Sequence, residues 1–313
     1  MTDSEPQAMS VGTLQPASAP RAAAAQALGS AQIEIDCTLS YELGSTCDFV
    51  FLVHASSGPS QSIVEEELRL EPATPFRTYV DSHSGNRFLR LQAPAGQFSL
   101  TYRALVERTI EPVDTIAPEV PVHDIPDDVL HFLLPTRYCE SDLLGPTAVE
   151  LFGALPRGHS RVQAITDWVH GNIEYRIGST NATTTARDVF AQRMGVCRDY
   201  AHLAVTFCRA LNIPARLVSG YANFPEPPPD FHAIFEAFVG GRWVLFDPSG
   251  MAPVDHVVRV ATGRDAKDVA FATIFGPARM VAMSPEVRIV RTSPVAPMRL
   301  EPGTVQRQTE AAV

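Results

Sequence analysis

The sequence has few cysteines, few tryptophans and no long apolar run. Its five cysteines are odd in number and widely spaced, and no two of them form a CxxC pair. This pattern disfavours a disulfide framework and a structural zinc site, so we expect reduced thiols. No stretch approaches the roughly 18 to 20 apolar residues of a membrane span. The N-terminus MTDSEPQAMS also lacks a signal peptide's basic and apolar segments, so we expect a cytoplasmic protein without membrane contact.

Positive charge is also scarce. The formal net charge is −10, which argues against nucleic acid as a partner because phosphate binding requires clustered Lys and Arg. The sequence contains neither an HExxH motif nor an Asp/Asn-rich loop of EF-hand type, so it predicts no metal and no other cofactor. Hydrophobic residues make up 45% of the chain, which is typical of soluble globular proteins. The oligomeric state stays open.

Composition divides the 313 residues into five segments. Residues 1–30 are rich in Ala, Pro, Ser and Gln, and residues 293–313 are similar, so we expect disorder at both ends. Residues 31–112 contain short alternating apolar stretches separated by Gly, Pro and Asn turns. This pattern predicts an N-terminal antiparallel β-sandwich domain. Residues 113–135 are proline-rich and form a connector.

Residues 136–292 change to helical periodicity and then return to strands, which predicts an α+β domain with helices packed on an antiparallel sheet. One helix is expected within VQAITDWVH. A second is expected in TTTARDVFAQRMG, capped by Thr184 or Thr185 and ended by Gly195. A third runs from Cys197 to about Leu211. A strand (215–222) and a hairpin (231–248) follow.

Cys197 lies at the N-terminal end of the third expected helix, after Gly195-Val196. Unpaired backbone N–H groups and the positive end of the helix dipole favour thiolate over thiol there, and the same groups can stabilise an oxyanion. Gly195 permits a tight turn that leaves the thiol approachable. The alternative is a half-buried cysteine that merely starts a helix. Cys208, on the apolar stripe of that helix, is interpreted as structural.

The hairpin supplies candidate partners for the thiol. If Gly240-Gly241 forms a two-residue turn, Val239 opposes Arg242. His232 and Asp247 then emerge on one face as diagonal neighbours, roughly 7 to 8 Å apart at the backbone, and Asp247 can orient the imidazole. A turn of odd length would place Asp247 on the opposite face, and the alternative role for Asp247 is to begin a turn before Pro248. Glu236 shares the face of His232, as a rim residue or a salt-bridge partner.

Three ordered motifs resemble the bacterial transglutaminase-like family within the papain-like cysteine enzyme superfamily. They are GVCRDYAHLAVTFCRALNIPARLVSGYA, FHAIFEAFVGGRWVLFDPSG and HVVRVATGRDAKDVA. LLPTRYCESD and DWVHGNIEYRIGSTNATTTARDVFAQRMG are similar to the segments that precede the nucleophile in that family. The likeness covers about residues 33–290 and implies the family's N-terminal β domain followed by its catalytic core.

The resemblance implies Cys197 as nucleophile, His232 as general base and acid, and Asp247 as orienting carboxylate, and it implies no cofactor. Members of the family often have Trp two residues after the histidine, where this chain has Ile234. That difference alters the pocket beside the base and leaves the triad intact. Tyr175 is a candidate second oxyanion donor, and it could equally be a core residue.

Three functions fit this reading. The first is a thiol enzyme that hydrolyses a peptide or carboxamide bond through a thioester, as a cysteine protease or amidase. The second is a transglutaminase that transfers the acyl group to an amine. The third is a non-catalytic binding module on the same fold. We favour hydrolysis because excluding water requires a dry tunnel lined by aromatics, and the chain has only two tryptophans, Trp168 and Trp243. The substrate is expected to be a protein or peptide.

Overall fold

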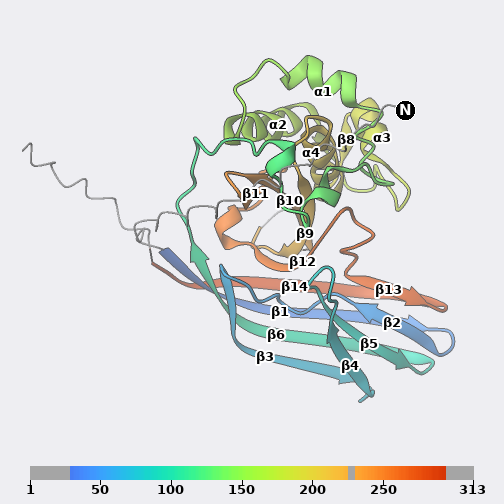
Figure 1. Cartoon of the computed structure of the whole chain (residues 1–313). Coiled ribbons are helices and arrows are strands. Elements are labelled where there is room, and N and C mark those ends of the chain that lie inside the picture. The colour runs from blue at the N-terminus through green and yellow to red at the C-terminus, as the bar shows by residue number, and fades with distance from the viewer. Residues whose placement is uncertain (1–28, 225–229, 294–313) are drawn as a thin grey trace, which may run out of the picture. The chain divides into compact units, whose positions relative to one another are not determined.

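A computed structural model describes residues 29–224 and 230–293 (Figure 1). The arms expected to be disordered lie outside these residues, except that Gly29 and Ser30 belong to the first strand and Ser293 belongs to the last. Residues 225–229 also lie outside the described residues. No described helix is both long enough and apolar enough to span a membrane.

The N-terminal β domain consists of two four-stranded antiparallel sheets, as its alternating sequence predicts. In β1, every second residue is buried, which is the period expected when one face of a strand packs on a core. β3 is an element that its sequence does not predict, because its run of glutamates favours helix over strand. The strands are β1 (Gly29–Leu43), β2 (Cys47–Phe51), β3 (Gln61–Glu71), β4 (Phe76–Val80), β5 (Arg87–Ala93) and β6 (Gly96–Ile110).

The last two strands of the chain complete these sheets. β14 (Ala278–Ser293) pairs with β1 along nearly its whole length, and β13 (Ala272–Phe275) pairs with β2. The strand orders are therefore β14-β1-β6-β3 and β13-β2-β5-β4. This corrects the expected boundary at residue 292 for the catalytic core, since residues from Ala272 onward belong to the N-terminal sheets. Composition could not show this, because strand pairing between distant segments leaves no local signature.

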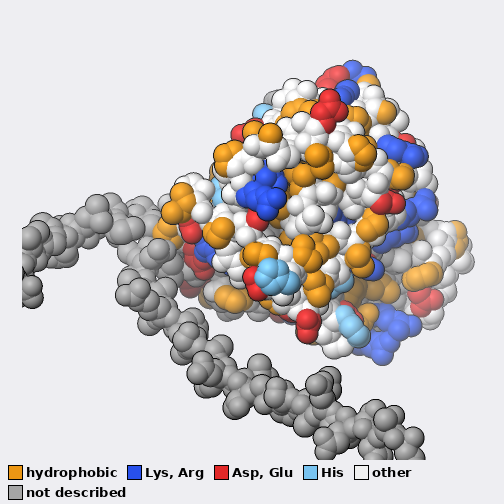
Figure 2. Space-filling model, turned by 45° about the horizontal axis from the view of Figure 1, so that its top comes forward, with side chains coloured by type: hydrophobic (Ala, Val, Ile, Leu, Met, Phe, Trp, Pro, Cys, Tyr) orange, Lys and Arg blue, Asp and Glu red, His pale blue; other side chains and the backbone are white. Residues whose placement is uncertain are grey.

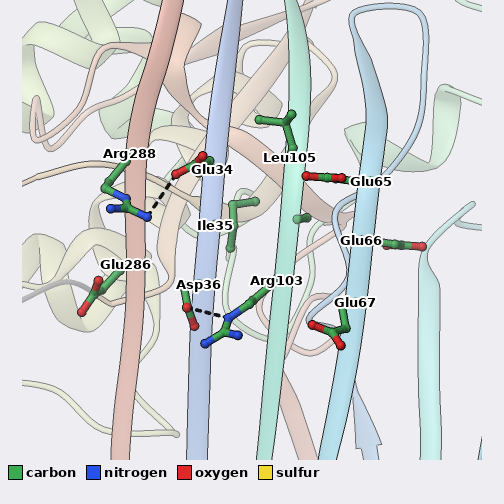
Figure 3. Close-up of a pocket in the computed structure, with 11 residues that line it drawn as sticks. Glu34, Ile35, Asp36, Glu65, Glu66, Glu67, Arg103, Leu105, Glu286 and Arg288 are labelled. Carbon is green, nitrogen blue, oxygen red and sulfur yellow. Dashed lines mark hydrogen bonds and ion pairs between the residues drawn. The ribbon is translucent and has the colours of Figure 1, made fainter.

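The exposed face of the sheet β14-β1-β6-β3 carries many charged side chains. Glu34 pairs with Arg288 and Asp36 pairs with Arg103 across neighbouring strands, and Glu65 and Glu67 project beside them (Figure 3). Cross-strand opposite charges of this kind stabilise a solvated sheet face. On another face of the molecule, acidic and basic side chains are interspersed among single apolar ones (Figure 2).

Four helices follow the connector, with α4 in contact with each of the other three and with β10. α3 is capped by Thr185, whose hydroxyl accepts from the Asp188 N–H, as expected. It ends earlier than expected, because Arg193 adopts the left-handed conformation and Gly195 lies beyond it. The helices are α1 (Gly145–Phe152), α2 (His159–Asn172), α3 (Ala186–Gln192) and α4 (Cys197–Ala210), with short 3-10 turns η1 (Val122–Asp124), η2 (Leu130–Leu133) and η3 (Val254–His256).

The helices pack against a four-stranded antiparallel sheet of order β11-β10-β9-β12, which confirms the α+β assignment. The hairpin register is the expected one: Val239 pairs with Arg242 and Phe235 with Phe246. Gly240 and Gly241 both have positive φ, as a tight two-residue turn of this kind requires. The strands are β9 (Ala215–Tyr221), β10 (His232–Val239), β11 (Arg242–Phe246) and β12 (Val258–Gly263).

Candidate active site

Cys197 is the first residue of α4, and its side chain is half-buried. Its backbone N–H therefore belongs to the first turn, where N–H groups have no partner within the helix. Asp199, which is 1% exposed, accepts a hydrogen bond from the Val196 N–H at 2.9 Å and fixes the chain at the helix start. A Cβ at Gly195 would lie 2.7 Å from the Asp199 Cβ. Gly195 is thus required by this close approach, and its φ is not positive.

Tyr175 is brought beside Cys197 by a short parallel pairing of β7 (Glu174–Tyr175) with β8 (Met194–Gly195), in which Tyr175 pairs with Gly195. Burial, and then the neighbouring Cys197 thiol, raise the pKa of the Tyr175 hydroxyl well above its usual value, while hydrogen bonding with the Cys197 N–H acts to lower it. The hydroxyl therefore lies within reach of both the thiol and the backbone N–H of Cys197. A hydroxyl near the backbone N–H of a cysteine at a helix start is a candidate oxyanion donor.

His232 and Asp247 meet as the hairpin register predicts. Nε2 of His232 lies 2.9 Å from Oδ2 of Asp247, and both side chains are buried. Asp247 is held in turn by the residues after it: Ser249 donates to Oδ1 through both N–H and hydroxyl, and the Ala252 N–H donates to Oδ2. Asp247 therefore both begins the turn before Pro248 and contacts His232, so the two roles considered for it are compatible.

The other imidazole nitrogen, Nδ1 of His232, is buried and has no hydrogen-bond partner among the described residues. Burial disfavours the imidazolium, but the hydrogen bond to Asp247 and the adjacent Cys197 outweigh it and raise the pKa of His232 to about 10. Burial likewise works against the Asp247 carboxylate, and the hydrogen bond from His232 prevails to lower its pKa. The arrangement thus stabilises a charged imidazolium between a carboxylate and a thiol.

A cavity of about 350 Å³ opens over Cys197 and His232. Its walls are mostly apolar, with Leu217, Phe231 and Phe271 among them, and Arg198 and Lys267 contribute the positive charges. Neither tryptophan lines it: Trp168 packs on Phe207 in the helical core, and Trp243 packs on Phe238. The cavity therefore offers an apolar surface for a substrate side chain directly beside the thiol.

Comparison with known proteins identifies the family. Residues 147–248 match the family model of the transglutaminase-like superfamily, and residues 32–128 match the bacterial transglutaminase N-terminal domain. A solved structure from Cytophaga hutchinsonii, described as a candidate cysteine protease, is 42% identical with a TM-score of 0.81, covering 84% of this chain and 92% of that one. The chain belongs to the transglutaminase-like superfamily. The superfamily core spans α4 and the hairpin of β10 and β11, and the second match covers most of the β domain.

Curated relatives of this transglutaminase-like protein are similar over shorter stretches. An uncharacterised protein of Mycobacterium leprae is 28% identical over 233 residues, which is 68% of this chain and 81% of the relative. An uncharacterised protein of Mycobacterium bovis is 34% identical over 115 residues, which is 32% of this chain and 37% of the relative. Both relatives are uncharacterised, so neither suggests an activity for this chain.

Two residues that hold the site in place were not identified from the sequence. Asp199 was not singled out, although an acidic residue at the third position of a helix is a recognisable capping signal. Ser249 was also missed, although Asp-Pro-Ser is a common turn sequence. Ile234, which stands where Trp is frequent in the family, is fully buried in a small apolar cluster. Within residues 29–224 and 230–293, no three His, Cys, Asp or Glu side chains gather as metal ligands would.

Proposed function

We propose that this protein is a thiol hydrolase that cleaves amide bonds of peptides or carboxamides, with Cys197 as nucleophile, His232 as acid and base, and Asp247 as its orienting carboxylate. The observation that supports it most directly is the His232 ring, with one nitrogen 2.9 Å from Asp247 and the other unpartnered beside the Cys197 thiol. A base that is oriented on one side and free on the other is the arrangement that nucleophilic catalysis requires.

In the proposed reaction, the Cys197 sulfur forms a bond to the carbonyl carbon, and the carbonyl π electrons move onto oxygen. The Cys197 N–H and the Tyr175 hydroxyl stabilise that oxyanion. Collapse of the intermediate breaks the C–N bond while the His232 imidazolium protonates the departing amine, which leaves a thioester. His232 then takes a proton from water, and the hydroxide attacks the thioester to release the acid and the thiolate.

Water is favoured over an amine as the second nucleophile because the cavity has no tryptophan-lined approach for an amine. An acyl-transfer enzyme must exclude water from the thioester, which requires an enclosed approach for the amine. Neither tryptophan of the chain reaches the cavity. Transglutaminase activity is therefore the second candidate, and it would use the same three residues.

Product analysis separates the two candidates. The protein is incubated with a library of glutamine-containing peptides in ¹⁸O-labelled water, with and without a primary amine. We expect cleaved or deamidated products that carry one labelled oxygen, in nearly the same yield whether or not the amine is present. Mass spectrometry identifies each product directly.

Dominant incorporation of the amine would instead identify a transglutaminase. The binding-module alternative is tested on the same sample by the rate of iodoacetamide labelling at Cys197. A catalytic thiol is expected to react well below pH 8, whereas a cysteine in a non-catalytic module should react slowly there. Slow labelling together with no product of any kind would refute the enzyme proposal.

Replacing Tyr175 with phenylalanine is expected to lower kcat roughly 10²-fold with little change in KM, because the hydroxyl contributes only once the oxyanion forms. Steady-state kinetics on a peptide substrate measures both constants. The matched control is Tyr200→Phe, which removes a neighbouring hydroxyl that donates to the Ile173 carbonyl. That change should affect stability and leave kcat within about threefold. Equal kcat in wild type and Tyr175→Phe would assign Tyr175 to the core.

A further inference from the structure

A second and larger cavity lies away from the proposed catalytic residues. Its volume is about 780 Å³, within the range of small-molecule sites. Side chains from the N-terminal sheets and from the core sheet line it together, and Cys197, His232 and Asp247 are not among them. Residues from both sides are joined around it by direct hydrogen bonds, such as those between Gln61 and the Arg259 backbone. The cavity is therefore a built feature of the fold.

Arg108 is the unusual member of this lining. It projects from the buried face of β6 and is only 4% exposed. Its Nε and Nη1 atoms are buried and have no hydrogen-bond partner among the described residues. Burial, assisted by the nearby Arg259, lowers the pKa of Arg108 to about 10. A buried guanidinium without an acceptor is costly, because it has lost its hydration and gained no partner in exchange.

The neighbouring carboxylate cannot supply that acceptor. Glu236 is 1% exposed, and both of its oxygens are engaged: Oε1 accepts from Arg259 at 2.6 and 2.9 Å, and Oε2 accepts from Arg216 at 2.7 Å. Glu236 is thus a buried salt-bridge partner, one of its two expected roles. Arg216 and Arg259 therefore occupy this carboxylate, and Arg108 is the guanidinium beside it that has no hydrogen-bond acceptor among the described residues.

Three other carboxylates face the cavity. Glu111 is paired with Arg242 at 2.6 Å, and Asp128 and Asp255 form no ion pair among the described residues. Asp255 attracts Arg108 through its charge without a hydrogen bond. A bound anion would therefore compete with Asp255 for the positive charge of Arg108. On the same wall, the Ser60 hydroxyl accepts from Arg259 at 3.1 Å, so its own proton is free to donate into the cavity.

We propose that this cavity binds a small organic anion whose carboxylate or phosphate group accepts hydrogen bonds from Arg108. The volume exceeds what a bare inorganic ion needs, and the apolar side of Trp243 offers a surface for the rest of the molecule. Guanidinium groups pair with carboxylate and phosphate oxygens through hydrogen bonds, so an anion in the cavity would give Arg108 an acceptor that it otherwise lacks among the described residues. This site is independent of the proposed amide hydrolysis.

The test uses citrate and inorganic phosphate as probes, at constant ionic strength set with chloride. We expect citrate to raise the Tm of the full chain by a few degrees and to give a measurable Kd by calorimetry. Inorganic phosphate tests how much of the binding comes from the negative charge alone, without an organic group. Arg108→Gln should weaken citrate binding at least tenfold. The matched control is Arg103→Gln on the same strand, whose exposed side chain pairs with Asp36 at 2.8 Å and should leave binding unchanged.

Asp255→Asn is the second variant, and its citrate binding tests the proposal if Arg108→Gln fails to fold. Removal of a competing carboxylate should tighten citrate binding severalfold. If Asp255→Asn instead lowers the Tm and leaves citrate binding unchanged, then Asp255 is the partner of Arg108 and the proposal is overturned. The absence of any citrate or phosphate effect on the wild-type protein, or an equal effect in the Arg108 and Arg103 variants, would overturn it as well.

Discussion

Replacement of Cys197 by alanine is expected to reduce kcat roughly 10⁴- to 10⁶-fold on any substrate that the wild-type protein turns over. The sulfur forms the covalent bond in the proposed reaction, and no other described group near the cavity can replace it. Residual turnover would come only from the oxyanion donors and from binding. The measurement is kcat from initial rates at saturating peptide, with folding verified by circular dichroism.

The control lies on the same helix. Cys208 is fully buried on the apolar stripe of α4, and burial raises its pKa far above the ordinary value. Cys208→Ala should therefore lower the Tm, because it removes packed volume, and leave kcat nearly unchanged. If Cys197→Ala retained substantial turnover, the nucleophile would have to be sought elsewhere and the thioester chemistry would be abandoned.

Asp247→Asn is expected to lower kcat about 10²- to 10⁴-fold, because an amide neither stabilises the imidazolium nor holds the ring in the required tautomer. Its effect on pH dependence follows from the charge. In the wild-type protein the pKa of His232 is raised to about 10, so the imidazolium is present at neutral pH and is lost only as the pH rises toward that value. Without Asp247, burial dominates and the imidazolium is lost at lower pH.

Alkylation of Cys197 reports this change without a substrate. The rate of iodoacetamide labelling in wild type should stay high between about pH 6 and 8, because the His232 imidazolium beside the sulfur persists over this range. In Asp247→Asn, labelling at pH 6 to 7 should fall severalfold and recover only at higher pH. Asp36→Asn, which breaks an exposed ion pair with Arg103, is the matched control and should follow wild type. Identical labelling profiles for all three proteins would remove Asp247 from the site.

The hairpin shows how far sequence reasoning reaches. Gly240-Gly241 fixes a two-residue turn, the turn fixes the register, and the register places His232 and Asp247 on one face. Each step is local, because strand alternation and turn geometry depend on neighbours in the chain. The start of α4 at Cys197 was predictable for the same reason.

Other features depend on segments far apart in the chain. The pairing of β14 with β1 joins residues that have no local signal for each other, so the C-terminal strands were assigned to the wrong domain. The end of α3 was predicted too late because Gly195 was taken as the residue that ends the helix. The structure instead requires glycine there because the Asp199 side chain approaches it closely. Tyr175 could be named only as one of two alternatives, since a short pairing between β7 and β8 brings it to the thiol.

The amino-acid sequence by itself determined the α+β class, the transglutaminase-like family, the start of α4 at Cys197 and the facing of His232 and Asp247. The family follows from the resemblance of three ordered motifs, and the other features follow from periodicities, caps and turns that act over a few residues. Only the tertiary structure decided that Tyr175 adjoins Cys197, that β13 and β14 complete the N-terminal sheets, and that Arg108 is buried without a partner. Burial and proximity between distant segments arise from packing the whole chain, and no short stretch of sequence encodes them alone.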